Sequence, residues 1–420
     1  MIPKCRENCT NTEFPNSSWT IGQSKEEAMR RDINNARPDA GSRPRNKHVV
    51  ALSLTVGIAL TASILAPTVA ANAATSEAAA GIARATAVIK AYSKPPTWKG
   101  PSSTVSVKGL AGKRVVYINV SSGIPVLKYW SDHVTDLALK YGGVKVEVVD
   151  AKGSVDEANK GIAMAIATKA NVVLLQAFAT SLFTKQIADM HAAGIKVITG
   201  NTGVPGDVSG GQDAEVSFDY AQVGRIVADW FVIDSKGKGK ALVISSDDVP
   251  ASPTQARATI AEAKKNCPTC SVTLKDVQIP QWETSIPTLF QSTMNTEPDR
   301  TYLLPIYDGQ SLPGLGAIRT AGAGSKVKVG TFNATPGIVE SLKDPKSGLK
   351  LDVGGNNEWW AYAGTDTIFR VLSGTAPIAN YNIGLRVFST SNADLISGSD
   401  DGAWYGYTGF RARFKSLWKK

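Results

Sequence analysis

A regular alternation of short apolar runs with amphipathic segments constrains the fold of this chain more than any other feature. It begins near Lys113, with an apolar run over 115–120, apolar residues at helical spacing over 126–141 and a second run over 144–149. Continuous apolar strands that alternate with amphipathic helices are typical of a parallel sheet covered on both faces. The sequence therefore predicts an α/β fold.

The alternation occurs twice along the chain. The first series ends with an apolar run over 196–199, and a second series opens with a helical pattern over 220–234 and a strand pattern over 240–245. The last clear helical pattern covers 360–372. Two series in one chain predict two doubly wound parallel-sheet lobes joined by a hinge.

The restart of the alternation predicts a boundary between the two lobes near residue 217. The family resemblance described below implies how each lobe is completed: the first lobe, 113–217, by about 358–387, and the second lobe, 218–357, by about 388–420. Ligands of such sheets bind beyond the carboxyl ends of the strands. With two lobes facing each other, the expected site is the cleft between them.

The N-terminal part has the layout of an export leader over 43–73. Basic residues precede an apolar run over 49–65, which is followed by Pro67 and by the small-residue motif Ala71–Ala73. This order is typical of a secretory signal peptide, whereas an uncleaved membrane anchor is the alternative. The run is at the short limit for a membrane span. We therefore expect an exported protein, in the periplasm or at the cell surface.

The segments on either side of the leader have different compositions. Residues 1–42 form a polar extension without clear periodicity, and Met29 is an alternative start. Residues 74–112 are rich in Ala and then in Ser, Pro and Gly, which predicts a linker with a short helix over 76–92.

Charge argues against a nucleic-acid partner. The formal net charge is +10, and the part after Ala73 keeps 37 basic and 30 acidic residues, spread along the chain. A nucleic-acid binder usually concentrates its positive charge on one face or in one arm. We expect a monomer that binds neither nucleic acid nor a cofactor.

Cys267 and Cys270 form a Cys-Pro-Thr-Cys motif between a helical pattern and an apparent strand. In an oxidising compartment this spacing favours a structural disulfide. A redox motif would instead be expected at the N-terminus of a helix. A zinc site would need two more ligands, and only His133 and His191 follow the leader, so we expect no metal.

The sequence offers little material for catalysis. Two histidines after the leader leave few options for a Ser-His-Asp or Cys-His site. No Gly-x-Ser-x-Gly, Walker A or His-Glu-x-x-His pattern occurs. We therefore expect a binding protein with no catalytic residues.

Several short motifs between Lys113 and Val387 carry a family resemblance. They are the helix-to-strand unit 189–198, the crossover motif 218–225, the segment 307–317 and the strand-end motif 330–336. In this order and spacing, the chain resembles the type I periplasmic (solute) binding proteins of ABC transporters, in the ribose- and sugar-binding-like group. The resemblance implies a ligand held by hinge closure and an ABC transporter permease as partner. LacI-type repressors share these lobes, but an export leader stands here in place of their helix-turn-helix.

The resemblance and the expected topology together indicate the ligand-binding residues. The expected contacts come from the loop after the first strand, from strand ends of both lobes and from the lobe crossings. They are Ser122, Phe178, Asn201, Gln255, Trp282, Asp308, Asn333, Asn357 and Glu358. Carboxylate and amide groups bind hydroxyls, and a tryptophan face packs against the C–H face of a sugar.

Departures from the family pattern narrow the range of ligands that the site is expected to bind. Thr202 and Gln255 stand where the family has ligand-binding arginines, and Val126 and Leu127 replace aromatic residues of the first loop. Without a clear cation, the site predicts a neutral, sugar- or polyol-like ligand, or a cationic one, and not an anion.

The hinge and the C-terminal end complete the predictions. We expect the hinge near Ser217, Asn356 and Val387. The aromatic-rich tail 390–420 extends past the resemblance, either as a strand pair on a lobe or as a partner surface. An exported ligand sensor that signals to a membrane receptor or kinase is the alternative function.

Overall fold

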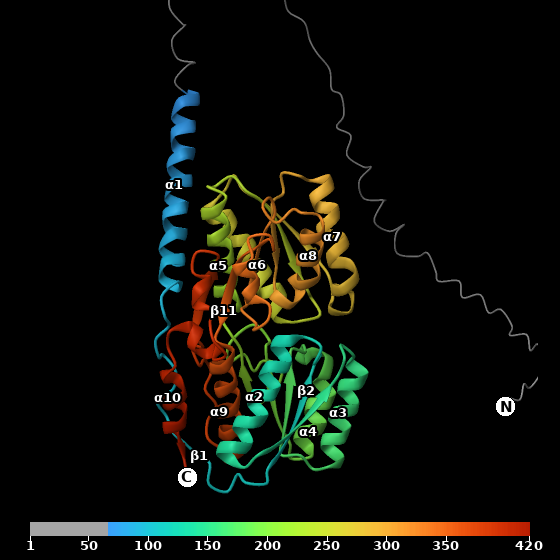
Figure 1. Ribbon diagram of the computed structural model, residues 1–420. Coiled ribbons are helices and arrows are strands. Elements are labelled where there is room, and N and C mark those ends of the chain that lie inside the picture. The colour runs from blue at the N-terminus through green and yellow to red at the C-terminus, as the bar shows by residue number, and fades with distance from the viewer. Residues whose placement is uncertain (1–65) are drawn as a thin grey trace, which may run out of the picture. The chain divides into compact units, whose positions relative to one another are not determined.

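The computed structural model describes residues 66–420. The predicted extension 1–42 and most of the predicted leader 43–73 lie outside these residues. Two sheets covered by helices form two lobes, and the chain passes between them several times (Figure 1). This arrangement is the two-lobed α/β fold expected from the apolar alternation.

The first lobe contains a parallel sheet with the strand order β3-β2-β4-β5-β6. Its strands are β2 (Arg114–Asn119), β3 (Lys145–Asp150), β4 (Val172–Gln176), β5 (Lys196–Gly200) and β6 (Ala214–Val216). Its helices include α2 (Pro125–Gly142), α3 (Val155–Ala167) and α4 (Thr184–Ala192). Every residue of the central strand β4 is buried, which explains its continuous apolar sequence.

The second lobe contains a sheet with the strand order β12-β11-β10-β9-β7-β8, in which only the edge strand β12 is antiparallel to its neighbour. Its strands are β7 (Lys240–Ser245), β8 (Ser271–Asp276), β9 (Tyr302–Pro305), β10 (Lys328–Asn333), β11 (Leu349–Gly355) and β12 (Leu385–Ser389). Its helices are α5 (Tyr220–Asp234), α6 (Ala251–Asn266), α7 (Trp282–Thr296) and α8 (Asp308–Thr320). Between β10 and β11 the chain forms only the short 3₁₀ turn η3 (Val339–Lys343).

Helix α9 (Asn357–Ser373) returns the chain to the first lobe, where it packs on α2. Its start is capped by Asn356, whose side chain accepts a hydrogen bond from Trp359 N at 2.9 Å. Gly374 ends it in the left-handed conformation at φ 71°. The third hinge segment is therefore 374–384 and not Val387, because Val387 already lies in β12, paired with Val353.

The C-terminal tail is divided between the two lobes. Strand β12 and the 3₁₀ turn η4 (Ala393–Leu395) lie in the second lobe, which agrees with the expectation for the start of 388–420. Helix α10 (Gly409–Leu417), in contrast, packs on α9, and β13 (Trp418–Lys419) pairs in parallel with β1 (Val105–Ser106), so the end of the tail completes the first lobe and not the second. Aromatic contacts explain this placement: the ring of Phe410 stacks on Trp359 with a centroid distance of 5.3 Å, and that of Trp418 stacks on Tyr362 at 5.7 Å. The longest element of the tail is α10, and the tail does not form a strand pair of its own.

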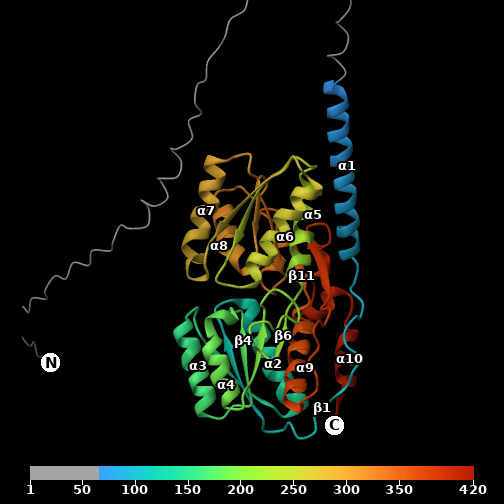
Figure 2. The same ribbon diagram turned by 180° about the vertical axis from the view of Figure 1, so that it is seen from behind.

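The segment 74–112 contains the predicted helix and a crossing between the lobes, and both of its ends pack on the fold. Helix α1 (Ala66–Tyr92) runs along α5 and α6 of the second lobe, as both views show (Figures 1 and 2). It includes the predicted cleavage motif 71–73. Arg84 Nε donates to Asn266 Oδ1 at 3.0 Å, where α6 ends. The chain then crosses over 93–104 to β1 of the first lobe, with Trp98 stacked on Trp359. Over residues 66–420, no helix is both long and apolar enough to span a membrane.

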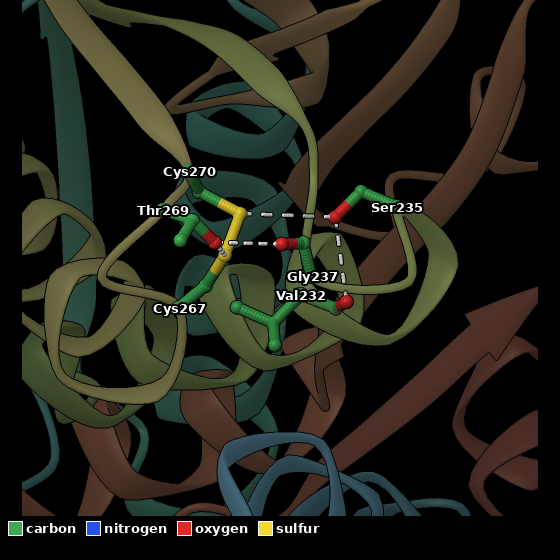
Figure 3. The surroundings of a disulfide bond; sticks show 6 residues. All are labelled: Val232, Ser235, Gly237, Cys267, Thr269 and Cys270. Atoms are coloured by element: carbon green, nitrogen blue, oxygen red, sulfur yellow. Dashed lines mark hydrogen bonds between the residues drawn. A yellow bond between two sulfur atoms is a disulfide. The ribbon is translucent and has the colours of Figure 1, made fainter. Parts of the chain in front are cut away.

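A disulfide joins Cys267, at the end of α6, to Cys270, just before β8 (Figure 3). Between them, Thr269 Oγ1 donates to the carbonyl oxygen of Gly237 at 2.9 Å. Gly237 has φ 70° and lies in the turn after α5. The short disulfide loop is therefore fastened to the turn that precedes β7.

Candidate ligand-binding site

A pocket lies between the lobes, with about 310 Å³ of space free of protein atoms in and around it, open solvent included. Most of its wall follows the carboxyl ends of strands: the loop after β2, the residue after β5, the loops after β7 and β9, and the end of β10. The lining residues are Ile124, Val126, Leu127, Asn201, Tyr220, Val249, Trp282, Tyr307, Asn333 and Trp360. The pocket therefore occupies the position at which doubly wound sheets bind their ligands.

The tryptophans of the pocket are held in place by their indole nitrogens. Trp282 Nε1 donates to Ser246 Oγ at 2.7 Å and to the carbonyl oxygen of Val277 at 3.1 Å. Trp360 Nε1 donates to the carbonyl oxygen of Val216 at 3.3 Å, and its ring stacks on Trp130 at 4.1 Å. Because both N–H groups bind the protein, these residues contribute mainly apolar surface to the pocket.

Asn201 forms the polar part of the first-lobe wall. It follows β5 with φ 65°, and its Oδ1 accepts a hydrogen bond from the Tyr220 hydroxyl. The following loop is held by the buried carboxylate of Glu215, which accepts hydrogen bonds from Thr202 Oγ1 at 2.9 Å, Gly206 N at 2.8 Å and the Ser217 hydroxyl. Burial raises the pKa of Glu215 to about 7, against these hydrogen bonds, which lower it.

Asn333 forms the polar part of the second-lobe wall, on a similarly held loop. Asn333 and Ala334 have φ values of 130° and 51°, in the region that favours glycine. The Asp308 carboxylate accepts hydrogen bonds from Thr335 N at 2.6 Å and Thr335 Oγ1 at 3.0 Å, and Asp352 Oδ1 accepts one from Ala334 N at 3.0 Å. Burial raises the pKa of Asp308 to about 6 and that of Asp352 well above its usual value.

Three of the residues expected from the sequence line the pocket: Asn201, Trp282 and Asn333. Their contact with a ligand stays a prediction, now with a geometric basis. Asp308 is fully buried behind Asn333, and Asn357 Nδ2 donates to the carbonyl oxygen of Asn333 at 3.1 Å. These two residues position the pocket wall and do not form it.

The other expected residues lie outside the pocket lining and have partners within the protein. Gln255 is buried and donates to the carbonyl oxygen of Ile306 at 3.1 Å. Phe178 is buried with its ring against Phe183. Glu358 pairs with Arg411 of α10. Ser122 uses its backbone N–H to bind Asp150 Oδ1 at 3.0 Å.

Sequence reasoning missed most of the apolar wall. Val126 and Leu127 stood out only as replacements for family aromatics, although they line the pocket themselves. Tyr220 and Tyr307 each lie in a motif that carried the resemblance, and Tyr307 directly precedes Asp308. Both motifs were therefore recognised in the sequence, but Asp308 was predicted to contact the ligand in place of Tyr307, and no residue of the motif 218–225 was predicted to do so.

The pocket is electrically neutral. None of its lining residues carries a charge, and within 66–420 no cluster of three or more His, Cys, Asp or Glu residues could hold a metal. Such a wall suits an uncharged solute, because an ionised group removed from water without a partner is strongly unfavourable.

The fold and the pocket define a two-lobed binding protein, and comparison with known families agrees. The family of the periplasmic binding protein domain matches residues 115–376, so the chain belongs to this family. Its members are solute-binding proteins and not enzymes. A search of curated protein sequences finds no match.

Solved structures share the fold at low sequence identity. A solute-binding protein from Agrobacterium vitis with bound allitol is 18% identical, with a TM-score of 0.61 over 69% of this chain and 99% of its own. The 5-methylthioribose transporter solute-binding protein from Thermotoga lettingae is 13% identical, with a TM-score of 0.62 over 72% of this chain and 98% of its own. A Bacillus halodurans solute-binding protein with bound myo-inositol is 15% identical, with a TM-score of 0.60 over 71% of this chain and 100% of its own.

Proposed function

We propose that this protein is the extracytoplasmic substrate-binding component of an ABC importer and that it binds a small uncharged solute between its lobes. The observation that carries the proposal is the uncharged pocket at the strand ends, lined by both lobes. Family membership supports a binding role, and three structural neighbours hold allitol, 5-methylthioribose and myo-inositol, which are all uncharged. A sugar or polyol is thus the ligand class that the relatives suggest.

The proposed mechanism is closure of the two lobes around the ligand. The segments 93–104, 217–219, 356, 374–384 and 390–408 cross between the lobes, and the proposed hinge consists of 217–219, 356 and 374–384. A ligand that contacts Asn201 of the first lobe and Trp282 and Asn333 of the second stabilises the closed form more than the open one. The permease would then recognise the closed form, outside the cytoplasmic membrane.

The absence of a cation from the pocket wall supports an uncharged ligand. At the two positions where relatives place arginines, Thr202 donates to Glu215 and Gln255 to a backbone carbonyl. Neither residue lines the pocket. Carboxylate and phosphate ligands are usually bound by Arg or Lys side chains, which the pocket wall lacks, so we expect them to bind more weakly than uncharged ligands.

Thermal unfolding of the full chain against a panel of sugars, polyols, amino acids, polyamines and aromatic compounds tests the proposal. We expect a saturable rise in the unfolding midpoint with an uncharged compound, since a ligand at a hundredfold over its Kd adds about 2.7 kcal/mol. The same rise should be lost in Trp282→Ala and kept in Glu283→Gln, an exposed neighbour on α7. A shift with charged compounds alone, or one that Trp282→Ala leaves intact, would refute the proposed site.

A further inference from the structure

We infer that the ligand is a single-ring uncharged compound with a mostly apolar surface and only a few hydrogen-bonding groups, and not a polyhydroxylated sugar. The inference rests on the proposed function and specifies its substrate class. It depends on two properties of the pocket: the apolar composition of the wall and the small number of polar groups left free.

The wall of the pocket is mainly apolar. Of the ten lining residues, eight are aliphatic or aromatic and two are asparagines. The aliphatic side chains are those of Ile124, Val126, Leu127 and Val249, and the aromatic ones those of Tyr220, Trp282, Tyr307 and Trp360. Aromatic walls favour flat apolar rings through stacked or edge contacts.

Most polar groups of the wall already have partners. The indole N–H groups of Trp282 and Trp360 donate to protein oxygens, and the Tyr220 hydroxyl donates to Asn201 Oδ1. Asn333 Nδ2 faces Asp308 Oδ1 at 3.5 Å. These groups are therefore engaged before a ligand arrives.

Three polar groups of the pocket wall have no hydrogen-bond partner among the described residues. The Tyr307 hydroxyl is buried without a hydrogen-bond partner among the described residues. Asn201 Nδ2 and Asn333 Oδ1 also make no hydrogen bond within 66–420. The pocket can thus offer one amide donor, one amide acceptor and one phenol, with an asparagine from each lobe.

This supply fits a ligand with one or two oxygen- or nitrogen-containing groups. A hexose carries about five hydroxyls, and each hydroxyl buried without a partner reduces affinity by roughly tenfold. The aromatic side chains of the wall offer flat apolar faces and edges, which suit a ring more than a flexible chain. An aromatic alcohol or a neutral aromatic amide meets all these requirements.

Titration calorimetry of the full chain with matched probes tests the inference. The probes are benzyl alcohol and benzamide as apolar rings with one polar group, benzoate as the charged control, and galactose and myo-inositol as polyhydroxylated rings. We expect saturable binding of benzamide or benzyl alcohol at least tenfold tighter than of either polyhydroxylated ring, and weaker binding of benzoate than of benzamide. Tyr307→Phe, which removes one hydroxyl and keeps the ring, should weaken binding by about fivefold or more.

A second variant reverses the preference. Leu127→Asn adds a polar group to the wall, so it should weaken the binding of benzamide and improve that of galactose. If galactose or myo-inositol binds tighter than both apolar rings, the inference is wrong and the proposed function stands. If none of the probes and no member of the wider solute panel binds, both are wrong as stated.

Discussion

The buried carboxylate of Glu215 predicts a specific dependence of stability on pH. Glu215 lies on β6 beneath the loop that carries Asn201, and three donors from Thr202, Gly206 and Ser217 surround it. Burial raises its pKa from 4.5 to about 7. The folded state therefore retains its proton over a pH interval in which the unfolded state has lost it.

The sign and size of the effect follow from this difference. Below about pH 4.5 both states are protonated, and Glu215 makes no pH-dependent contribution to stability. As the pH rises to 7, the folded state binds more protons than the unfolded state, so the free energy of unfolding falls. The difference between the ordinary pKa of 4.5 and the folded-state pKa of about 7 corresponds to roughly 3 kcal/mol of the free energy of unfolding. This contribution is lost by pH 8.

Glu215→Gln removes the ionisation and keeps a side chain of similar shape. Its amide oxygen can accept from Gly206 N, and its amide nitrogen can donate to the hydroxyls of Thr202 or Ser217. The free energy of unfolding of the variant, minus that of the unaltered protein, should rise by about 3 kcal/mol from pH 4 to pH 8. Urea unfolding at several pH values measures this difference, in which the other buried carboxylates cancel.

The matched control is Glu283→Gln, which removes one charge from an exposed position on α7. The change with pH for Glu215→Gln should exceed the change for this exposed position by most of the roughly 3 kcal/mol. Equal changes for the two variants would refute the reasoning, because burial of Glu215 would then have no effect on its titration.

Three further changes test the packing of the fold. Arg370→Met should cost about 3–5 kcal/mol in urea unfolding, because it leaves the Asp366 carboxylate without its buried cation on α9; a loss below 1 kcal/mol would contradict this. Gly224→Ala should lower the melting temperature, at a cost of about 1–3 kcal/mol, because the new methyl group would meet the backbone of α6 at 2.4 Å. Helix propensity alone predicts a higher melting temperature, and that result would show that α5 moves away from α6 easily. Replacing Cys267 and Cys270 by Ser should cost about 2 kcal/mol, because the disulfide closes a short loop; equal denaturant midpoints would contradict this.

Local periodicity predicted most of the fold. The apolar runs at 115–120 and 196–199 are the strands β2 and β5, and the helical pattern over 126–141 is α2. These elements are continuous in sequence, and burial dictates their pattern. The pairing of β1 with β13 was not predicted, because two strands of two residues at distant positions have no local signal. The same limit applied to α10, whose position depends on contacts with Trp359 and Tyr362.

The pocket lies at the strand ends, where the sequence predicts the site, but only three of its lining residues were among the predicted ones. The loop after β9 was expected to contribute through Asp308, whereas Tyr307 lines the pocket and Asp308 is fully buried. One position along a loop decides whether a side chain faces the cavity or the core. That orientation depends on backbone angles, such as φ 130° at Asn333, which the residue order does not reveal.

The pairing of β1 with β13 has a consequence for the order in which parts of the protein fold. The last residues, Trp418 and Lys419, complete a sheet with residues 105 and 106, and Trp418 Nε1 binds Asp366 Oδ1 at 2.8 Å in the middle of α9. The five-stranded sheet of the first lobe is complete by residue 216, so this pairing adds contacts between residues that lie far apart along the chain. Contacts between such distant residues form slowly, so we expect the tail to dock after that sheet has formed.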